Sequence, residues 1–110
     1  MDNRLKRKCD INEVFLKGKR VYSKSVTLIY LEKAELKVGI SVSKKHGNAV
    51  ERNHVKRLLR AVYFPILKQL KNYYIVFLPK TGQIHSFEQF FKDVNYLLKK
   101  EKLINEKGIN

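Results

Sequence analysis

A dense run of basic side chains between positions 41 and 60 gives this sequence its clearest chemical potential. The run reads SVSKKHGNAVERNHVKRLLR, and only Glu51 offsets its positive charges. Arginine offers forked donors that match phosphate oxygens, and lysine supplies a compact point charge. The residue types and their density therefore predict a polyanion site built from Lys44, Lys45, Arg52, Lys56, Arg57 and Arg60.

Helical periodicity gathers most of these cations on one face. A helix would form one row at i, i+4 and i+8 and a second row beside it, namely Arg52, Lys56 and Arg60, then Asn53 and Arg57. Like charges at i, i+4 cost roughly 0.2 to 0.5 kcal/mol per pair. A merely solvated face would avoid that cost by alternating its charges, so phosphate binding is favoured. Asn53 either reads a base edge or a 2′-OH, or is a solvated surface amide.

Hydrolysis by protein side chains is a weaker alternative. Glu35-Leu36-Lys37 is a fragment of one metal-dependent nuclease motif, and His46, His54 and His85 could act as acids or bases. Glu35, however, falls in an expected turn, and no two carboxylates are spaced to hold a metal. Cys9 is the only cysteine, which excludes an internal disulfide and a zinc knuckle. We expect no catalytic and no metal-binding residues in this chain.

Composition supports a nucleic-acid partner. The 110 residues carry 24 Lys and Arg against 10 Asp and Glu, a net charge of +14, so the chain repels itself unless a polyanion is bound. No apolar run reaches the roughly 18 residues of a membrane span, and the N-terminus lacks a signal-like apolar stretch. We expect one cytoplasmic domain over residues 1–110, with flexible ends at 1–8 and 105–110 and no membrane or small-molecule partner.

The first half of the chain predicts one helix and two strands. Asp10 and Glu13 have capping-box spacing, so a short helix should follow Asp10 and end at Gly18 in a left-handed conformation. Residues 26–31 and 36–42 are rich in β-branched and alternating apolar residues, which indicates two strands. The short link between them predicts an antiparallel hairpin.

The second half predicts helix, strand and helix. Asn48 and Glu51 repeat the capping pattern before an amphipathic helix that Pro65 should interrupt near Phe64. Residues 73–78 form a buried strand, and Ser86 opens a last helix whose apolar stripe is Phe87, Phe90, Phe91, Val94, Leu97 and Leu98. The order α-β-β-α-β-α predicts an α+β two-layer domain with a small mixed β-sheet of three or four strands packed against helices.

The basic run also resembles a known family signature. Val38-Gly39-Ile40-Ser41-Val42-Ser43-Lys44-Lys45, followed by Gly47-Asn48-Ala49-Val50-x-Arg52-Asn53-x-Val55-Lys56-Arg57-Leu58-Leu59-Arg60, is similar to the motif of the bacterial ribonuclease P protein component. The resemblance implies a small subunit that joins a catalytic RNA and assists Mg²⁺-dependent removal of the 5′ leader from precursor tRNA. The RNA subunit would bind the Mg²⁺ and carry the hydrolysis. It also implies a left-handed β-α-β crossover.

Carried onto this chain, the resemblance assigns two sets of RNA-binding residues. The set for the catalytic RNA is Lys44, Lys45, Asn48, Arg52, Asn53, His54, Lys56, Arg57 and Arg60. The set for a leader cleft between the first helix and the sheet is Phe15, Tyr30, Arg4, Lys6 and Ile11. The leader should stack on aromatic rings in that cleft, although an aromatic in a strand is more often a core residue.

Several assignments have alternatives or depart from the family pattern. Arg4 and Lys6, with the neighbouring basic residues, either steer the leader by charge or form a solvated arm. The family usually has an arginine where His54 stands, and often a second aromatic where Ile11 stands. A histidine loses the full charge and the forked donors of arginine. A general or ribosomal RNA-binding protein remains the alternative function.

Overall fold

The part of the chain that the structure describes folds into three α-helices, four strands and two 3₁₀ segments. The structure is a computed structural model that describes residues 4–81 and 85–104, apart from the side chain of Lys44. In chain order the elements are α1 Lys8–Lys17, β1 Lys19–Tyr22, β2 Val26–Glu32, β3 Lys37–Ile40, η1 Lys44–His46, α2 Ala49–Tyr63, η2 Phe64–Gln69, β4 Tyr73–Pro79 and α3 Phe87–Lys100. The predicted α+β fold with a small mixed sheet packed against helices is confirmed, and the sheet has four strands where the predicted order contained three.

The sheet has the order β1-β2-β4-β3. β2 runs antiparallel to both β1 and β4, and β3 runs parallel to β4. The predicted hairpin between residues 26–31 and 36–42 is therefore wrong, because β4 lies between those two strands. Four consecutive residues of β4 are buried, so this apolar strand takes a central position where both of its faces are covered. The predicted left-handed β-α-β crossover concerns the connection from β3 through α2 to the parallel strand β4.

β1 is the strand that the sequence patterns did not reveal. Its four residues include one buried side chain, Val21, between exposed neighbours. A four-residue strand carries too little alternation to be distinguished from a loop. Its pairing with β2, with Lys19 opposite Tyr30, makes β1 an edge of the sheet.

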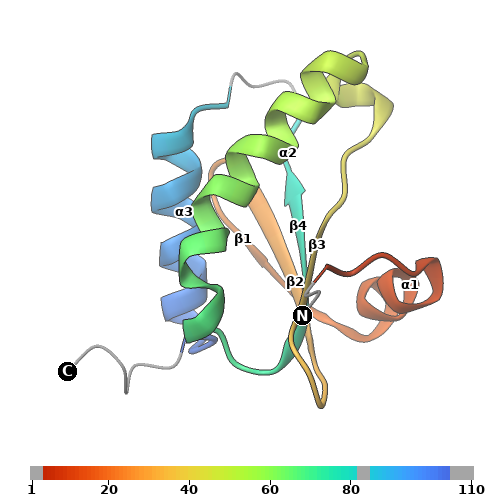
Figure 1. Ribbon diagram of the computed structural model, residues 1–110, viewed down its shortest axis with the longest axis vertical. Coiled ribbons are helices and arrows are strands. Elements are labelled where there is room, and N and C mark those ends of the chain that lie inside the picture. The colour runs from red at the N-terminus through yellow and green to blue at the C-terminus, as the bar shows by residue number, and fades with distance from the viewer. Residues whose placement is uncertain (1–3, 82–84, 105–110) are drawn as a thin grey trace.

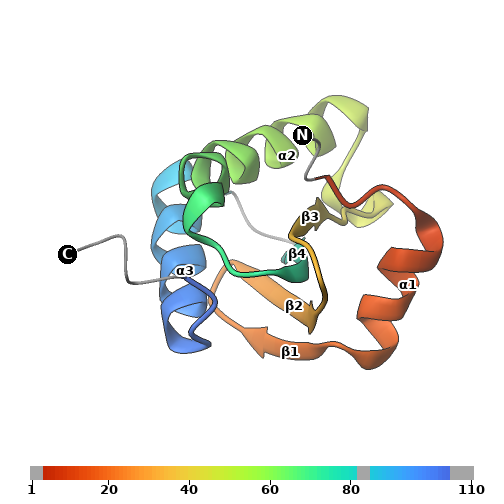
Figure 2. The same ribbon diagram turned by 60° about the horizontal axis from the view of Figure 1, so that its bottom comes forward.

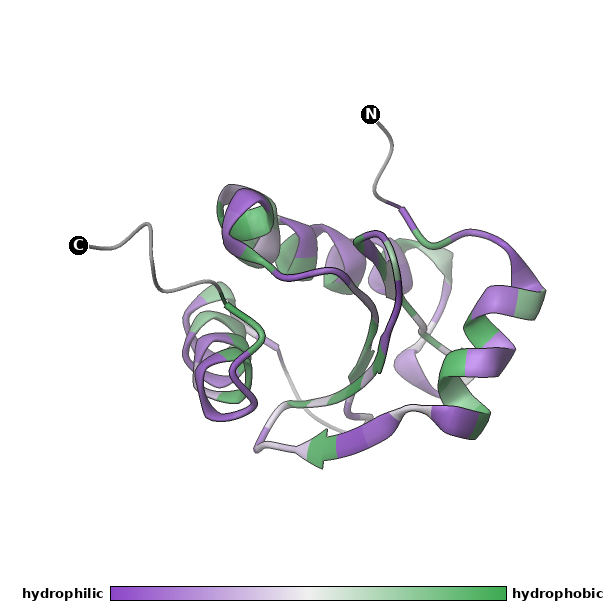
Figure 3. Cartoon of the chain, turned by 90° about the horizontal axis from the view of Figure 1, so that it is seen from below, coloured by the Kyte–Doolittle hydropathy of each residue, from purple (hydrophilic) through white to green (hydrophobic). Residues whose placement is uncertain are grey.

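Helices cover the two faces of the sheet unequally. In Figure 1, α2 and α3 lie side by side over one face, and α1 stands apart from both. Alternation along β2 separates the two cores, since Leu28 packs in the large cluster with α2 and α3 and Ile29 packs in the small cluster with α1. Figure 3 shows hydrophobic and hydrophilic residues alternating along each helix, as amphipathic packing requires.

Three helix signals are confirmed. The Asn48 side chain accepts from the Glu51 amide at 2.9 Å, and the Glu51 carboxylate accepts from the Asn48 amide at 3.0 Å. α2 ends at Tyr63, and Pro65 lies at the start of η2. The Ser86 hydroxyl accepts from the Gln89 amide at 3.2 Å and so caps α3.

Two other helix predictions are wrong. α1 begins at Lys8, so Asp10 lies inside the helix and caps nothing; its carboxylate lies 3.9 Å from Arg7. On α3, Phe87 and Phe91 stack on each other with ring centroids 5.9 Å apart, and both remain exposed. The buried stripe of α3 is therefore narrower than its apolar stripe, because Phe87 and Phe91 stay outside the core.

Gly18 ends α1 for a different reason than the predicted left-handed conformation. Its φ is −73°, which any residue adopts. A β-carbon there would lie 2.5 Å from the Val14 carbonyl oxygen and 2.8 Å from Ile29 Cγ2. Glycine is required because the chain passes too close to β2 for any side chain.

Replacing Gly18 with alanine should therefore destabilise the protein by about 2 kcal/mol, as overpacking does elsewhere. Urea unfolding followed by circular dichroism measures this change. Ala34→Ser in the exposed loop between β2 and β3 is a control that should stay within about 0.5 kcal/mol of the parent. A Gly18→Ala protein as stable as the parent would contradict the steric explanation.

The ends of the chain are described only in part. Residues 105–110 and 1–3 of the predicted flexible segments lie outside the described residues. Leu5 is 5% exposed, and Leu103 is fully buried in the large apolar cluster. Among the helices that the structure describes, none has the length and apolar character needed to cross a membrane.

Candidate nucleic-acid interface

α2 presents three rows of exposed or half-buried side chains around its buried stripe. Lys56 and Arg60 line a groove on one flank, and Val50 and His54 line a cavity on the other. Asn53 and Arg57 lie between these flanks, and both are exposed. The structure thus brings together most of the predicted set for the catalytic RNA, and it places His54 on a different hollow from Lys56 and Arg60.

Glu51, the acidic residue of α2, forms hydrogen bonds that cap the N-terminus of the helix. Glu51 and Asn48 bond reciprocally as described, so the Asn48 amide side chain also serves the helix cap. The half-buried Arg52 has a buried Nε without a hydrogen-bond partner. The cations of α2 are therefore not neutralised by the carboxylate nearest to them in sequence.

His46 fixes the loop that carries the predicted lysines. Its Nδ1 accepts from the Ser43 amide at 3.0 Å, which leaves the proton on Nε2 to donate to the Pro79 carbonyl oxygen at 2.6 Å. This pair of bonds joins η1 to the end of β4. Lys45 is exposed beside it, while the side chain of Lys44 is outside what the structure describes.

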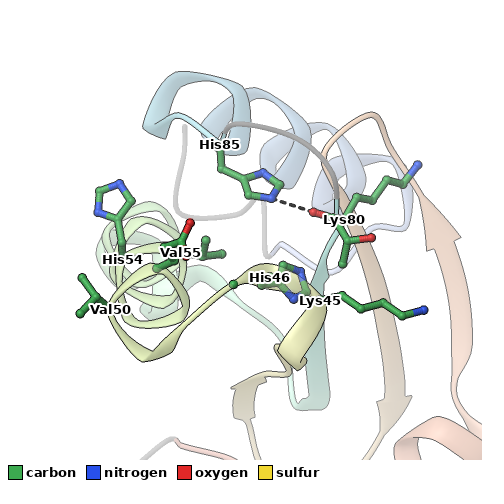
Figure 4. Close-up of a pocket in the computed structure, with 10 residues that line it drawn as sticks. Lys45, His46, Val50, His54, Val55, Lys80 and His85 are labelled. Carbon is green, nitrogen blue, oxygen red and sulfur yellow. Dashed lines mark hydrogen bonds between the residues drawn. The ribbon is translucent and has the colours of Figure 1, made fainter.

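His85 makes a similar bond to the next carbonyl along the chain. Its Nε2 donates to the Lys80 carbonyl oxygen at 2.7 Å, and its ring stacks on Phe90 with centroids 4.7 Å apart. Burial lowers the pKa of His85, and nearby His46 lowers it further against the opposing effect of the Lys80 carbonyl. Figure 4 shows these two rings near the end of β4 and the ring of His54 apart from both.

The contacts of His46 and His85 fix the backbone at the end of β4. His46, His54 and His85 line a cavity of about 660 Å³ together with Lys45, Lys80 and Thr81. His46 and His85 are already committed to backbone carbonyls, and the neutral His85 has no acidic partner. Sequence reasoning missed Lys80, which follows β4. Its position in the same cavity as Lys45 depends on the pairing of β3 with β4, which the sequence did not reveal.

The carboxylates of the described residues do not form a metal site. Within residues 4–81 and 85–104, no group of three or more His, Cys, Asp or Glu side chains could hold a metal ion. Glu13 bonds Lys33 at 2.7 Å, and that bond lowers the pKa of the Glu13 carboxyl. Glu35 accepts from the Tyr74 hydroxyl at 3.5 Å at the other end of the sheet from the histidines. The donor set therefore does not fit the metal-dependent nuclease.

A cleft between α1 and the sheet contains part of the predicted leader set. A hollow of about 180 Å³ is lined by Ile11 of α1, by Gly39 to Val42 and by Lys56 and Val76. Phe15 lies one turn further along α1 and is half-buried, with the Arg20 guanidinium 5.7 Å from its ring centroid. Arg20 is a cation that sequence reasoning missed, because β1 was not predicted.

Tyr30 lies on the opposite face of the sheet from α1. Its ring packs edge-on against Tyr73, with centroids 5.5 Å apart, and its hydroxyl donates to Glu101 at 2.5 Å. Burial and the hydrogen bond to Glu101 raise the pKa of Tyr30, and the same bond lowers the pKa of Glu101. The structure does not bring Tyr30 together with Phe15 and Ile11.

Arg4 and Lys6 also lie away from Phe15. Both line a groove of about 280 Å³ against α2, where Lys56, Arg60 and Tyr63 form the other side. Burial raises the pKa of Tyr63, with Arg60 opposing that rise. Two residues that were assigned to the leader cleft thus share a surface with two that were assigned to the catalytic RNA.

Comparison with known proteins identifies relatives over most of the chain. The family model described as Ribonuclease P matches residues 1–102. The ribonuclease P protein component of Bacillus pumilus (strain SAFR-032) is 37% identical over 110 residues, covering 94% of this chain and 92% of that protein. Its counterpart from Bacillus velezensis is 39% identical over 105 residues, covering 92% and 90%.

Solved structures of the same kind of protein share the fold. The Staphylococcus aureus RNase P protein at 2.0 Å superposes with a TM-score of 0.85 at 26% identity, covering 96% of this chain and 100% of that one. The Thermotoga maritima RNase P protein gives a TM-score of 0.78 at 24% identity, covering 88% and 96%, and supports the fold alone. Given the family match and the identity to relatives of nearly equal length, the chain belongs to the ribonuclease P protein component family.

Proposed function

We propose that this chain is the protein subunit of ribonuclease P, acting in the cytoplasm. It binds the catalytic RNA subunit, and it binds the single-stranded 5′ leader of precursor tRNA. Through both contacts it assists the Mg²⁺-dependent cleavage that produces the mature 5′ end. It takes no small-molecule substrate and has no membrane partner.

The observation that carries this proposal is the unneutralised basic face of α2. Arg57 and Arg60 are exposed, Lys56 and Arg52 are half-buried beside them, and Glu51 is held in the helix cap. Forked guanidinium donors on a rigid helix suit the phosphates of a folded RNA. Asn53 adds a hydrogen-bonding group in the same row.

The cleft between α1 and the sheet is the proposed leader site. In the hollow between α1 and the sheet, Ile11 offers an apolar wall and Lys56 a cation. Phe15 lies one turn further along α1 and belongs to the small apolar cluster on this face. Stacking of a base on an aromatic ring tolerates any sequence, which suits leaders that differ between precursors. Tyr30 is not part of this proposal, because it lies on the other face of the sheet.

Mg²⁺ is proposed to bind mainly to the RNA subunit. Four of the described carboxylates are engaged with Lys33, Ser25, Tyr30 and the α2 cap, and no three described His, Cys, Asp or Glu side chains are grouped as ligands. The protein contributes positive charge instead. That charge reduces the repulsion between two RNA molecules that must associate.

Precursor cleavage at limiting Mg²⁺ tests the proposal. The RNA subunit of the same organism should process a precursor tRNA slowly when alone and much faster when this protein is added. The protein without RNA but with Mg²⁺ should produce no mature tRNA. Turnover by the protein alone would overturn the assignment of catalysis to the RNA.

A general or ribosomal RNA-binding protein is the alternative, since a basic helix would serve that function as well. The two functions predict different effects of the 5′ leader on tRNA binding. With the RNA subunit present, precursor tRNA should bind more tightly than mature tRNA only if the protein contacts the leader. Equal affinities would favour the general RNA-binding function.

A further inference from the structure

The segment that precedes α1 is docked along the open edge of the sheet. We call residues Arg4 to Lys6 the N-terminal arm. Arg4 forms a parallel bridge with Val38 of β3, and the Leu5 amide donates to the Val38 carbonyl oxygen at 2.9 Å. The Leu5 side chain is buried in the small apolar cluster beside α1. The arm therefore has both a backbone anchor and a side-chain anchor.

Gly39 forms the recess in which Leu5 sits. A β-carbon at position 39 would lie 3.1 Å from the Leu5 carbonyl oxygen and 3.2 Å from Leu5 Cβ. Contacts this short would force the arm outward by several tenths of an ångström, since packed atoms prefer about 3.5 to 4.0 Å. The absence of a side chain at Gly39 thus permits the close approach of the arm to β3.

Docking places the cations of the arm across a groove from those of α2. Arg4 and Lys6 lie on one side, and Lys56 and Arg60 lie on the other. Among the described residues that line this groove, none is acidic. Figure 2 shows the red segment leading into α1 running from beside α2, on the side away from α3.

We propose that this arm–α2 groove binds phosphodiester groups of RNA, with Leu5 as the residue that positions the arm. The inference rests on the proposed function and refines it, because it moves Arg4 and Lys6 from the leader cleft to the interface of α2. Two guanidinium and two ammonium groups around one hollow offer several donors for phosphate oxygens, and the two arginines can bind them bidentately. A solvated arm would not require a buried anchor.

The groove also borders the cleft beside α1. Gly39, Ile40 and Lys56 line both hollows. Lys56 is therefore placed between an RNA strand in the cleft and phosphates in the groove. Arg4 and Lys6 line the groove and not the cleft, so docking of the arm directs its cations to the groove.

Salt-dependent binding to the RNA subunit tests the charges first. Arg4→Gln combined with Lys6→Gln should make the slope of log affinity against log salt shallower by about 2 and should weaken binding about 10- to 30-fold near 0.15 M salt. The matched control is Lys92→Gln with Lys99→Gln, two exposed lysines of α3, which should leave the slope unchanged.

Leu5→Ala tests the positioning role, because it keeps every charge and removes only the anchor. It should reduce the slope about as much as the double glutamine variant does, since an undocked arm no longer holds its cations against α2. Leu5→Met should restore binding, because methionine conserves volume and apolarity. Adding Leu5→Ala to the double variant should cause little further loss.

Circular dichroism melting confirms that each variant is folded at the binding temperature. A folded Leu5→Ala protein with the parent's affinity and slope would overturn the positioning role. Parent-like binding by the double glutamine variant would overturn the site itself, whether or not the Leu5 variants fold. Failure of the proposed function is a separate result, in which the parent protein binds ribonuclease P RNA no better than an unrelated RNA of equal length.

Discussion

Replacing Arg52, Arg57 and Arg60 with glutamine should weaken binding to ribonuclease P RNA about 100-fold near 0.15 M salt. Each phosphate contact contributes a slope of about −0.9 to the dependence of log affinity on log salt. If about six basic side chains of the α2 region contact phosphates, the parent slope is about −5 and the variant slope about −2.5. Filter binding or fluorescence anisotropy over a range of salt concentrations measures both quantities.

The same substitutions should not destabilise the free protein. They remove the like-charge pairs that Lys56 makes with Arg52 and Arg60 at i, i+4, which together cost up to about 1 kcal/mol at low salt. Stability in urea should therefore stay constant or rise while affinity falls. That opposite direction distinguishes a lost RNA contact from partial unfolding.

The matched control replaces three lysines of α3, Lys92, Lys99 and Lys100, with glutamine. It changes the net charge equally on another element. If both triple variants lose the same affinity, binding depends on total charge rather than on α2. A parent slope shallower than about −2 would show that most of the basic face stays solvated in the complex.

The basic helix could be predicted from sequence because every determinant of α2 is local. Asn48 and Glu51 define its start, the apolar spacing from Val55 defines its buried side, and Pro65 defines its end. Each signal acts within about four residues along the chain. The residues that share one face of a helix can therefore be identified from their spacing in the sequence.

The sheet order could not be predicted in the same way, because strand pairing is non-local. The link between β2 and β3 is short enough for a hairpin, yet β3 pairs with β4 after a crossover through α2. What decides the outcome is the burial of β4 on both faces, and that depends on all the helices together. The error carried over to Tyr30, whose face can be assigned only when the helices covering each face are known.

The composite surfaces were missed for a related reason. Arg4 and Lys56 are far apart in the sequence, and they meet because Leu5 docks beside Gly39. Arg20 reaches Phe15 through a strand that is too short to recognise. Gly39 carried a signal in principle, since a glycine inside a strand often marks a close backbone approach.

Asp93 links α3 to the turn between β1 and β2. Its carboxylate accepts from the Ser25 amide at 2.9 Å, from the Ser25 hydroxyl at 2.5 Å and from the Gln89 side chain at 3.0 Å. Ser25 is 1% exposed, and its carbonyl oxygen accepts from the Lys80 amide at 2.9 Å. The Asp93 carboxylate thus joins α3 to the β1–β2 turn, and the Ser25 carbonyl joins that turn to the residue after β4.

Asp93→Ala should destabilise the protein on the order of 3 kcal/mol, because it leaves the buried amide and hydroxyl of Ser25 without an acceptor. Lys92→Ala, at the adjacent exposed position, is the control and should change stability by less than about 0.5 kcal/mol. Chemical unfolding at neutral pH measures both values. Equal stabilities of the two variants would show that water replaces the carboxylate without cost.

The contribution of Asp93 should also depend on pH in a defined direction. Burial raises the pKa of Asp93, but the hydrogen bonds from Ser25 and Gln89 outweigh burial, so the pKa in the folded protein lies below its ordinary value. A group with a lowered folded pKa stabilises the protein fully above its unfolded pKa, and this stabilisation is lost as the pH falls through the folded pKa. The stability difference between the parent and Asp93→Asn should therefore be constant from about pH 7 to pH 5 and should shrink below about pH 4. A difference that persists unchanged into strong acid would mean that the side chain acts through packing alone and that its charge contributes nothing to the junction.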